Sequence, residues 1–435
     1  MNRWPSSFYS LVASGLIIIS ADGMAKEIGK PVEAVIVTHV KNDHQPALAL
    51  LKETVEINSG TMNFAGVRKV GAVFEREFKA LGFSTQWLDG KPFNRAGHLV
   101  AQYGTRGPKI LLIGHLDTVF AEDSPFQNMH MIGSDKASGP GVTDMKGGDV
   151  IIIPALRALR DAGQLDRVSI QVVLAGAEDN SGEPSALSKQ ALLEAGDWAD
   201  IAIGFEDGDG DPKTAAISRR GASGWQLEVK GRPAHSSQIF QPDVGDGAIF
   251  EAARILDGFR VALSAQPNLS FNPGVIVGGT DIRLDEQTSR GTAFGKSNVI
   301  AQSVRVDGDL RAISPEQLNL ARQTMRRIVE AHLPGASASI KFDDGYPPMA
   351  PTEGNAKLLS LYSKASEDYG FGPVIAINPR NAGAADISFV ADKVDMALDG
   401  IGLMGSGGHT VDETADLDTL DSQTIRAAVT LYRLS

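Results

Sequence analysis

The chain has 435 residues, more than one ordinary hydrophobic core accommodates, so two domains are expected. Its hydrophobic fraction (42%) and charged fraction (22%) are ordinary for a globular protein. The formal net charge is -12, whereas nucleic-acid-binding proteins usually carry a basic surface, so no nucleic-acid partner is expected. The sequence contains no cysteine. Disulfides and thiolate ligands are therefore excluded, and any bound metal must be held by histidine or carboxylate side chains.

Residues 1–25 have the features of a secretory signal peptide. Arg3 supplies a positive charge, residues 8–19 are largely apolar, and small residues are frequent in 20–25. The apolar run is shorter than the roughly 20 residues that a membrane-spanning helix needs. We therefore expect a periplasmic or secreted protein that has no membrane contact once the signal is cleaved. An uncleaved N-terminal anchor is the alternative.

Helical and strand-like segments both occur in residues 26–216, which predicts an α/β domain. The run at 109–113 is rich in isoleucine and leucine, as is typical of a buried strand. The expected helices are 45–57, 61–81 and 146–162, and the expected strands are 84–88, 98–103, 109–113, 168–174 and 200–205.

Residues 217–344 have a different order of strand and helix patterns. Strand patterns occur at 225–229, 275–277, 304–310 and 338–342, and helix patterns at 249–263 and from Pro315 onward. Ser314 is placed to cap the second helix, with Pro315 at its first position and Gln317 at its third. The order β-α-β-β-α-β is the ferredoxin-like arrangement. We therefore expect a ferredoxin-like domain inserted into an α/β domain whose two parts are residues 26–216 and 345–435.

Histidine and carboxylate residues follow three of the expected strands. The strand at 109–113 leads into His115 and Asp117, the strand at 168–174 leads to Glu178 and Asp179, and the strand at 200–205 ends at Glu206. Chemistry in α/β sheets is concentrated at such strand ends. Adjacent carboxylates repel each other unless a cation or a proton intervenes. Taken singly, a loop hydrogen bond and solvated acidic turns remain the alternatives.

Two further polar residues lie in glycine-rich loops. Asp144 stands in GPGVTDMKGG (residues 139–148), where glycines on both sides let the backbone pass close to another group. His409 stands in GSGGHT (residues 405–410). A core histidine would not need so many small neighbours, so a functional role for His409 is favoured.

These residues supply the parts of a hydrolytic site with two divalent cations. Such a site needs a carboxylate that bridges the ions, about two further ligands for each ion, and an unbound base. The predicted ligands are Asp144 as the bridge, His115 and Glu206 on one metal, and Asp179 and His409 on the other. Glu178, adjacent to a ligand, is the predicted general base, and Asp117 is predicted to orient the imidazole at position 115.

Five motifs, GHLDTV, GPGVTDMKGG, GAEDNSG, GFEDG and GGHTVDE, resemble the co-catalytic zinc peptidase family of glutamate carboxypeptidases, aminoacylases and succinyl-diaminopimelate desuccinylase. The likeness covers about residues 45–435 and is closest to the glutamate carboxypeptidase-like members. It implies amide hydrolysis, the roles given above, and two Zn2+ ions per subunit, with Co2+ or Mn2+ as substitutes. It also implies a homodimer formed through the inserted domain. The family usually has glutamate where this chain has the shorter Asp179.

The resemblance also assigns residues of the inserted domain. His235, in GRPAHSS, matches a histidine that helps to bind substrate and to stabilise the developing oxyanion, often in the partner's site. Asn298 and Arg311 resemble substrate-holding positions, and a guanidinium group suits a substrate carboxylate. The alternatives are a surface-loop histidine and a strand-end salt bridge. Arg380 and Asn381 lie in a polar segment that is a candidate for the pocket wall, which the sequence alone does not decide.

We therefore expect an exopeptidase, a carboxypeptidase that releases a C-terminal amino acid such as glutamate from a peptide or N-acyl amino acid. A water activated by two zinc ions would attack the amide carbonyl, with Glu178 as the base and His235 assisting. An aminoacylase or N-acyl amino acid deacylase is the enzymatic alternative. A catalytically dead relative or an exported metal-containing binding protein is the other alternative. Structural calcium is disfavoured, because calcium prefers about six to eight oxygen ligands and the predicted set includes two histidines.

Overall fold

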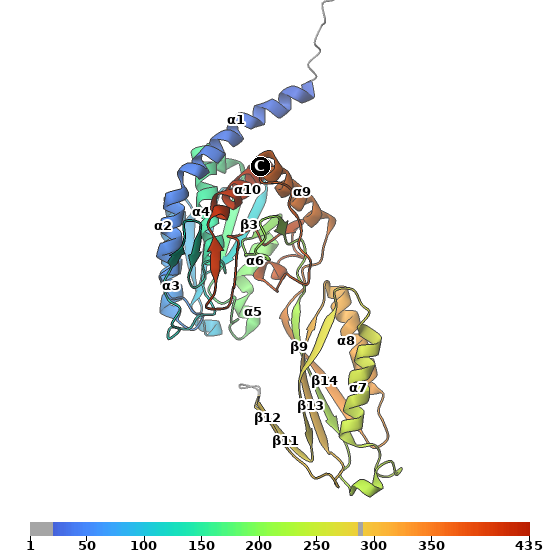
Figure 1. Ribbon diagram of the computed structural model, residues 1–435. Coiled ribbons are helices and arrows are strands. Elements are labelled where there is room, and N and C mark those ends of the chain that lie inside the picture. The colour runs from blue at the N-terminus through green and yellow to red at the C-terminus, as the bar shows by residue number, and fades with distance from the viewer. Residues whose placement is uncertain (1–20, 286–289) are drawn as a thin grey trace, which may run out of the picture.

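The computed structural model of the chain describes residues 21–285 and 290–435 and shows two lobes joined by extended segments (Figure 1). The helices are α1 (Ala21–Asn42), α2 (His44–Val55), α3 (Phe64–Ala80), α4 (Lys146–Asp161), α5 (Ser185–Ser188), α6 (Gln190–Trp198), α7 (Gly247–Leu263), α8 (Pro315–Glu330), α9 (Glu353–Asp368) and α10 (Asp418–Leu434), with short 3-10 turns η1 (Lys91–Phe93), η2 (Leu165–Arg167), η3 (Ser236–Gln238) and η4 (Asp386–Phe389). The strands are β1 (Ser84–Asp89), β2 (Gly97–Tyr103), β3 (Lys109–His115), β4 (His130–Ile132), β5 (Lys136–Ser138), β6 (Ser169–Ala175), β7 (Ile201–Gly204), β8 (Thr214–Ala215), β9 (Ala222–Lys230), β10 (Ser270–Gly279), β11 (Asp281–Asp285), β12 (Arg290–Phe294), β13 (Ser303–Arg311), β14 (Ser337–Tyr346), β15 (Ile375–Ala376), β16 (Met396–Leu398), β17 (Gly405–Ser406) and β18 (Thr414–Asp416).

A six-stranded sheet forms the centre of the larger lobe, in the order β1-β2-β6-β3-β7-β16. Strands β6, β3, β7 and β16 are parallel, while β1 and β2 are antiparallel to their neighbours. Along β3, Ile110 and Leu112 pack into one hydrophobic core, and Leu111 and Ile113 pack into a second one. The sheet is therefore buried on both faces, which explains the continuous apolar sequence of its central strand.

The predicted elements of this lobe correspond to observed ones. The helix expected at 146–162 is α4, and the strand expected at 109–113 extends as β3 to His115. A glycine in the first turn of α4, Gly148, has no room for a side chain, as the sequence indicated. A Cβ atom on Gly148 would lie 1.8 Å from the carbonyl oxygen of Phe205. Glycine at this position lets the start of α4 approach the end of β7, which brings the Asp144 loop next to the Glu206 loop.

The smaller lobe has the predicted ferredoxin-like topology. Its antiparallel sheet has the order β10-β13-β9-β14, and α7 and α8 pack on one face of it (Figure 1). The predicted cap of α8 is present, since the Ser314 hydroxyl accepts a 3.2 Å hydrogen bond from the backbone N–H of Gln317. The expected boundary at residue 344 lies within β14, which continues to Tyr346. The fold class, an α/β catalytic domain with an inserted α+β domain, is therefore confirmed.

Several features differ from the sequence expectations or lie outside them, including helices α1, α6, α9 and α10, which were not predicted. The hairpin β11–β12, between β10 and β13, was not predicted, because its short strands are mostly exposed and carry no continuous apolar pattern. Residues 1–20 of the predicted signal peptide lie outside the described residues, and 21–25 form the start of α1. Within the described residues, no helix combines the length and apolar character needed to cross a membrane.

Candidate metal centre and active site

Three neighbouring parallel strands bring the predicted ligands to one edge of the central sheet. His115 is the last residue of β3, Asp179 follows the end of β6, and Glu206 follows the end of β7. In the sheet, β3 lies between β6 and β7. The carboxyl ends of parallel strands lie at the same edge, so residues separated by up to 91 positions converge there.

Asp144 lies between two groups of candidate ligands. Its Oδ1 atom is 3.0 Å from His115 Nε2, and its Oδ2 atom is 2.7 Å from His409 Nε2. Glu206 Oε1 lies 3.7 Å from His115 Nε2, and Asp179 Oδ1 lies 3.4 Å from His409 Nε2. The five side chains thus form two groups that share Asp144, which is the arrangement the sequence predicted.

The chemistry of these residues fits two divalent cations. Both carboxylate oxygens of Asp179 are buried and have no hydrogen-bond partner. An unpaired buried carboxylate is costly unless a cation or a proton is present. Two imidazoles and three carboxylates are borderline ligands that suit zinc, cobalt or manganese better than calcium. The shorter side chain of Asp179 still reaches the group formed with Asp144 and His409.

Protons compete for this site. Burial raises the pKa values of Asp179 and Glu206 well above their usual range. Burial alone would lower the pKa of His115, but its hydrogen bond to Asp144 and the nearby carboxylates raise that pKa well above its usual value. The hydrogen bond to Asp144 raises the pKa of His409 to about 9. Cations must therefore displace protons from these ligands when they bind.

Glu178 has the properties of a general base. It lies next to Asp179 and belongs to neither ligand group. Burial raises the pKa of its carboxyl to about 7, close to the pH at which a base works best in neutral solution. Its backbone N–H donates a 3.0 Å hydrogen bond to Asp117 Oδ1, so its position is tied to the end of β3.

Asp117 contacts His115 mainly through its backbone carbonyl. The ring nitrogen Nδ1 of His115 lies 3.0 Å from the backbone carbonyl oxygen of Asp117 and 3.7 Å from its carboxylate. The carbonyl is therefore the group that orients the imidazole. The fully buried carboxylate instead accepts hydrogen bonds from the backbone N–H of Glu178 and from the Thr61 hydroxyl, the latter at 2.7 Å. Asp117 thus contacts the imidazole as expected, with its carbonyl oxygen nearer than its carboxylate.

The sequence reasoning missed Glu413, which holds the loop of the shared ligand. This fully buried carboxylate accepts hydrogen bonds from the backbone N–H groups of Gly141, Thr143 and Asp144 at 2.9, 2.9 and 3.1 Å. It lies four residues after His409, in the loop between β17 and β18, and directly precedes β18. Glu413 therefore joins the two glycine-rich loops. Its presence in the motif GGHTVDE was the only available sign of this role.

A second hydrogen-bond network that the sequence did not predict contacts the backbone of the general base. The hydroxyl of Tyr346, the last residue of β14, donates a 2.8 Å hydrogen bond to the backbone carbonyl of Glu178. The buried ammonium group of Lys189 lies 3.1 Å from that hydroxyl and 2.7 Å from Asp386 Oδ1. It also donates to the carbonyl of Ala177 at 3.3 Å. The inserted domain thus contacts the backbone of the base through its final strand.

The three residues assigned to substrate lie apart from this centre. His235 and Asn298 are exposed, on backbone segments joined by a 2.9 Å hydrogen bond from the Ser236 N–H to the Asn298 carbonyl. Arg311 forms a 2.8 Å ion pair with Asp309, so the predicted alternative of a strand-end salt bridge is present. Within the described residues, no hydrogen bond or ion pair joins these three side chains to the five candidate ligands.

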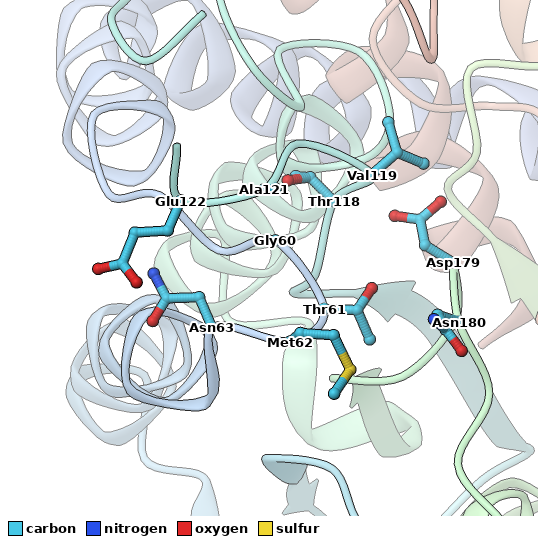
Figure 2. Close-up of a pocket in the computed structure, with 10 residues that line it drawn as sticks. All are labelled: Gly60, Thr61, Met62, Asn63, Thr118, Val119, Ala121, Glu122, Asp179 and Asn180. Atoms are coloured by element: carbon cyan, nitrogen blue, oxygen red, sulfur yellow. The ribbon is translucent and has the colours of Figure 1, made fainter. Parts of the chain in front are cut away.

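A cleft of about 380 Å³ opens beside the metal centre (Figure 2). Asp179 and Asn180 lie on one side of it, and Asn63 and Glu122 lie on the other, with Thr61 between them. Its charged side chains are both acidic. Through Asp179 the cleft opens onto one of the two metal-ligand groups.

The fold and the two ligand groups define a dinuclear metallohydrolase. The model for peptidase family M20/M25/M40 matches residues 111–433, so the chain belongs to that family. It is accordingly a zinc-dependent metallopeptidase or amidohydrolase with a dinuclear metal site, as the sequence indicated.

Two curated relatives cover most of the chain. Carboxypeptidase G2 from Pseudomonas sp. (strain RS-16) is 26% identical over 375 residues, which are 85% of this chain and 84% of the relative. Succinyl-diaminopimelate desuccinylase from Gluconacetobacter diazotrophicus is 24% identical over 403 residues, 89% of this chain and 97% of the relative.

Solved structures share the fold. The aminopeptidase PepT of Bacillus cereus has a TM-score of 0.70 at 17% identity, covering 90% of this chain and 98% of its own. An M20 family metallo-carboxypeptidase from Sulfolobus solfataricus has a TM-score of 0.63 at 16% identity, covering 89% of this chain and 99% of its own. These neighbours include an aminopeptidase and a carboxypeptidase, so the fold alone does not determine which end of a peptide is cleaved.

Proposed function

We propose that this protein is a carboxypeptidase that hydrolyses the amide bond before a C-terminal amino acid such as glutamate. The observation that carries the proposal is the pair of ligand groups that share Asp144, with Glu178 beside them. The similarity to carboxypeptidase G2 over most of the chain supports the release of a C-terminal residue.

The residues of the site support a base-assisted hydrolysis. Two divalent cations at these ligands would polarise the amide carbonyl and lower the pKa of a water molecule. Glu178 takes a proton from the attacking water and returns it to the leaving amine. The hydrogen bonds from its backbone to Asp117 and from Tyr346 to its backbone hold it in place. His235 stabilises the oxyanion when the inserted domain, of the same chain or of a partner, closes over the site.

An aminoacylase or deacylase is the second candidate. The observation that favours it is the similarity to succinyl-diaminopimelate desuccinylase. The two activities use the same chemistry and differ in which part of the substrate the enzyme recognises. A carboxypeptidase discriminates among released amino acids, whereas an acylase discriminates among acyl groups.

The test is release of free amino acids from N-acyl amino acids and from dipeptides with C-terminal glutamate, with zinc and with a chelator. We expect release that depends on zinc, with rates that vary more with the C-terminal residue than with the acyl group. The opposite pattern would establish the acylase. No release from any substrate, with folded and zinc-loaded protein, would contradict both and favour a binding protein or a dead relative.

We also propose a homodimer formed through the inserted domain. Phe240 and Phe250 are more than half exposed, their rings are 5.7 Å apart, and Ile249 on α7 and Ile276 on β10 are also exposed. Apolar side chains gathered on one domain are typical of an interface. Light scattering should give twice the chain mass, and Phe250→Glu should give the monomer. A monomeric wild-type protein would contradict this proposal.

Export is a further proposal, and it rests on the sequence of residues 1–25. After expression in a Gram-negative host, the periplasmic fraction should contain a shortened chain whose mass corresponds to loss of about 25 residues. Full-length protein confined to the cytoplasm would contradict it.

A further inference from the structure

The side chain of Asn180 lines the cleft of about 380 Å³ beside the metal centre (Figure 2). Asn180 directly follows the metal-ligand residue Asp179 and is two residues from Glu178. The sequence gave it no role of its own. Its place in the chain nevertheless puts a polar side chain next to the groups that would bind and attack a substrate.

Arg95, which lies between η1 and β2, fixes the orientation of this amide. Its Nη2 atom donates a 2.6 Å hydrogen bond to Asn180 Oδ1, and its Nε atom donates a 2.7 Å hydrogen bond to the backbone carbonyl of Asn180. Nη2 also donates to the carbonyl of Ser181 at 2.9 Å. A guanidinium group contains only donors, so it requires the oxygen of the amide on its own side. The Nδ2 group of Asn180 must therefore point away from Arg95.

This Nδ2 group remains available to a ligand. Within the described residues it donates no hydrogen bond, and Figure 2 shows it on the side of Asn180 that faces Thr61. The other side-chain amide of the cleft, that of Asn63, is used inside the protein. Its Oδ1 atom accepts from the Gly66 N–H at 3.0 Å, and its Nδ2 atom donates to Asn58 Oδ1 at 2.9 Å. Of the two amides, that of Asn180 is the one that can donate to a substrate.

Apolar side chains lie in the same cleft. Met62 and Val119 line it and are 58% and 42% exposed. Ligand sites typically combine apolar surface with a few fixed polar groups that set the orientation of the ligand. The cleft therefore offers an apolar wall and one oriented donor to the part of a substrate that lies beyond Asp179.

We propose that this cleft binds the acyl side of the substrate and that Asn180 Nδ2 donates a hydrogen bond to a carbonyl oxygen there. The preferred substrate then contains a second amide before the one that is hydrolysed, as in a tripeptide or an N-acylated dipeptide, and a simple fatty-acyl amino acid is disfavoured. An apolar side chain before the cleaved bond packs against Met62 and Val119. This inference rests on the proposed carboxypeptidase function and goes beyond it by assigning the acyl side of the substrate.

The test compares two substrates that have the same C-terminal amino acid, one acylated by N-acetylglycine and the other by pentanoic acid. The two acyl chains have the same length, and only the first contains a second amide. The measured quantity is the ratio of the two kcat/KM values, in which effects common to both substrates cancel. Asn180→Asp keeps an oxygen for Arg95 and replaces the donor by an acceptor, whereas Asn180→Ala removes both groups.

We expect both substitutions to lower this ratio by about 2- to 10-fold relative to the wild type, as for the loss of one hydrogen bond. Arg95→Gln should lower the ratio by a smaller factor, because it removes the group that orients the amide. Asn319→Asp, at an exposed asparagine on α8, is the matched control and should leave the ratio unchanged. A wild-type ratio in both Asn180 variants would make the Arg95–Asn180 contact a structural link within the loop and overturn the inference.

A binding measurement separates failure of this inference from failure of the proposed function. In zinc-loaded Glu178→Gln protein, adding Asn180→Asp should weaken the binding of the acetylglycyl ligand in calorimetry by about 2- to 10-fold and leave that of the pentanoyl ligand unchanged. Hydrolysis of both substrates with a ratio that neither Asn180 substitution changes would overturn the inference while the proposed function stands. Selective weakening of binding in a protein that hydrolyses neither substrate would support the assignment of the cleft while the proposed function fails.

Discussion

The metal centre and the inserted domain present their functional residues in opposite ways. In the centre, the imidazole of His115 is 1% exposed and lies within hydrogen-bond distance of Asp144, which in turn contacts His409. In the inserted domain, His235 and Asn298 are exposed and have no contact with the centre among the described residues. The candidate metal ligands are therefore assembled within one lobe, whereas the residues proposed to bind substrate lie on the other lobe and form no hydrogen bond to them among the described residues.

This difference predicts that metal binding and proton transfer depend on local contacts, while substrate recognition depends on how the lobes are arranged. Tyr346 is the exception, because it belongs to the last strand of the inserted domain and bonds to the backbone of Glu178. Substitutions in each region can separate the two kinds of effect.

The largest effect is expected for Glu178→Gln, because it removes the base without changing a metal ligand. We expect kcat to fall by about 10²- to 10⁴-fold, with zinc content near that of the wild type. Steady-state kinetics and elemental analysis measure the two quantities. Glu183→Gln changes an exposed acid in the same loop and should leave both unchanged. Substantial activity in the Glu178 variant would show that another group is the base.

His235→Ala tests whether the remote lobe takes part in the reaction. Loss of an oxyanion donor costs about 10²- to 10³-fold in kcat, and zinc content should not change, because the His235 side chain forms no hydrogen bond or ion pair with the ligands in the described residues. His130→Ala, an exposed histidine on β4, is the control. Unchanged kinetics for His235→Ala would make it the surface-loop histidine of the alternative interpretation.

Glu413→Ala tests the support of the shared ligand. Three backbone N–H groups around Asp144 would lose their acceptor, so the loop should no longer hold the carboxylate in place. Loss of such a supporting group typically costs about 10- to 100-fold in metal affinity. Competition with a chromophoric chelator measures the affinity, and Asp412→Ala changes an exposed neighbour as the control. Wild-type zinc affinity in the Glu413 variant would contradict this account of the loop.

The smallest effect is expected for Tyr346→Phe, which removes the hydrogen bond to the backbone of the base together with the one that the hydroxyl accepts from Lys189. A single hydrogen bond is worth about 0.5–1.5 kcal/mol, so kcat should fall by about 2- to 10-fold with KM nearly unchanged. Tyr362→Phe removes another buried tyrosine hydroxyl, bonded to Gln423 at 3.1 Å, and should affect stability alone. Equal effects of the two variants on kcat would reduce Tyr346 to a structural role.

The sequence predicted much of the fold and the ligand set for identifiable reasons. Apolar runs mark the buried strands, the cap at Ser314 marks the start of α8, and glycines beside Asp144 and His409 mark the loops that approach other groups. Each of these signals is local. The order of the polar motifs after successive strands was enough to expect that they would meet at one sheet edge.

The features that were missed depend on contacts between distant segments. Glu413 bonds to residues about 270 positions away, and Tyr346 bonds to a residue 168 positions away. The part of Asp117 nearest His115, its carbonyl, was not predicted, because spacing alone does not distinguish the carboxylate of a residue from its carbonyl. The position of His235 relative to the centre depends on the arrangement of the two lobes, which no local pattern encodes.

The central claim is that one lobe alone supplies the ligands of a dinuclear metal centre, and zinc titration of the chelator-treated protein tests it most directly. Zinc binding should saturate at two ions per chain, and hydrolysis of an N-acyl amino acid should return as the sites fill. The same titration of Asp144→Ala, which lacks the shared ligand, should show that both ions are weakened together. Saturation at one ion, or activity that persists without any metal, would contradict the account.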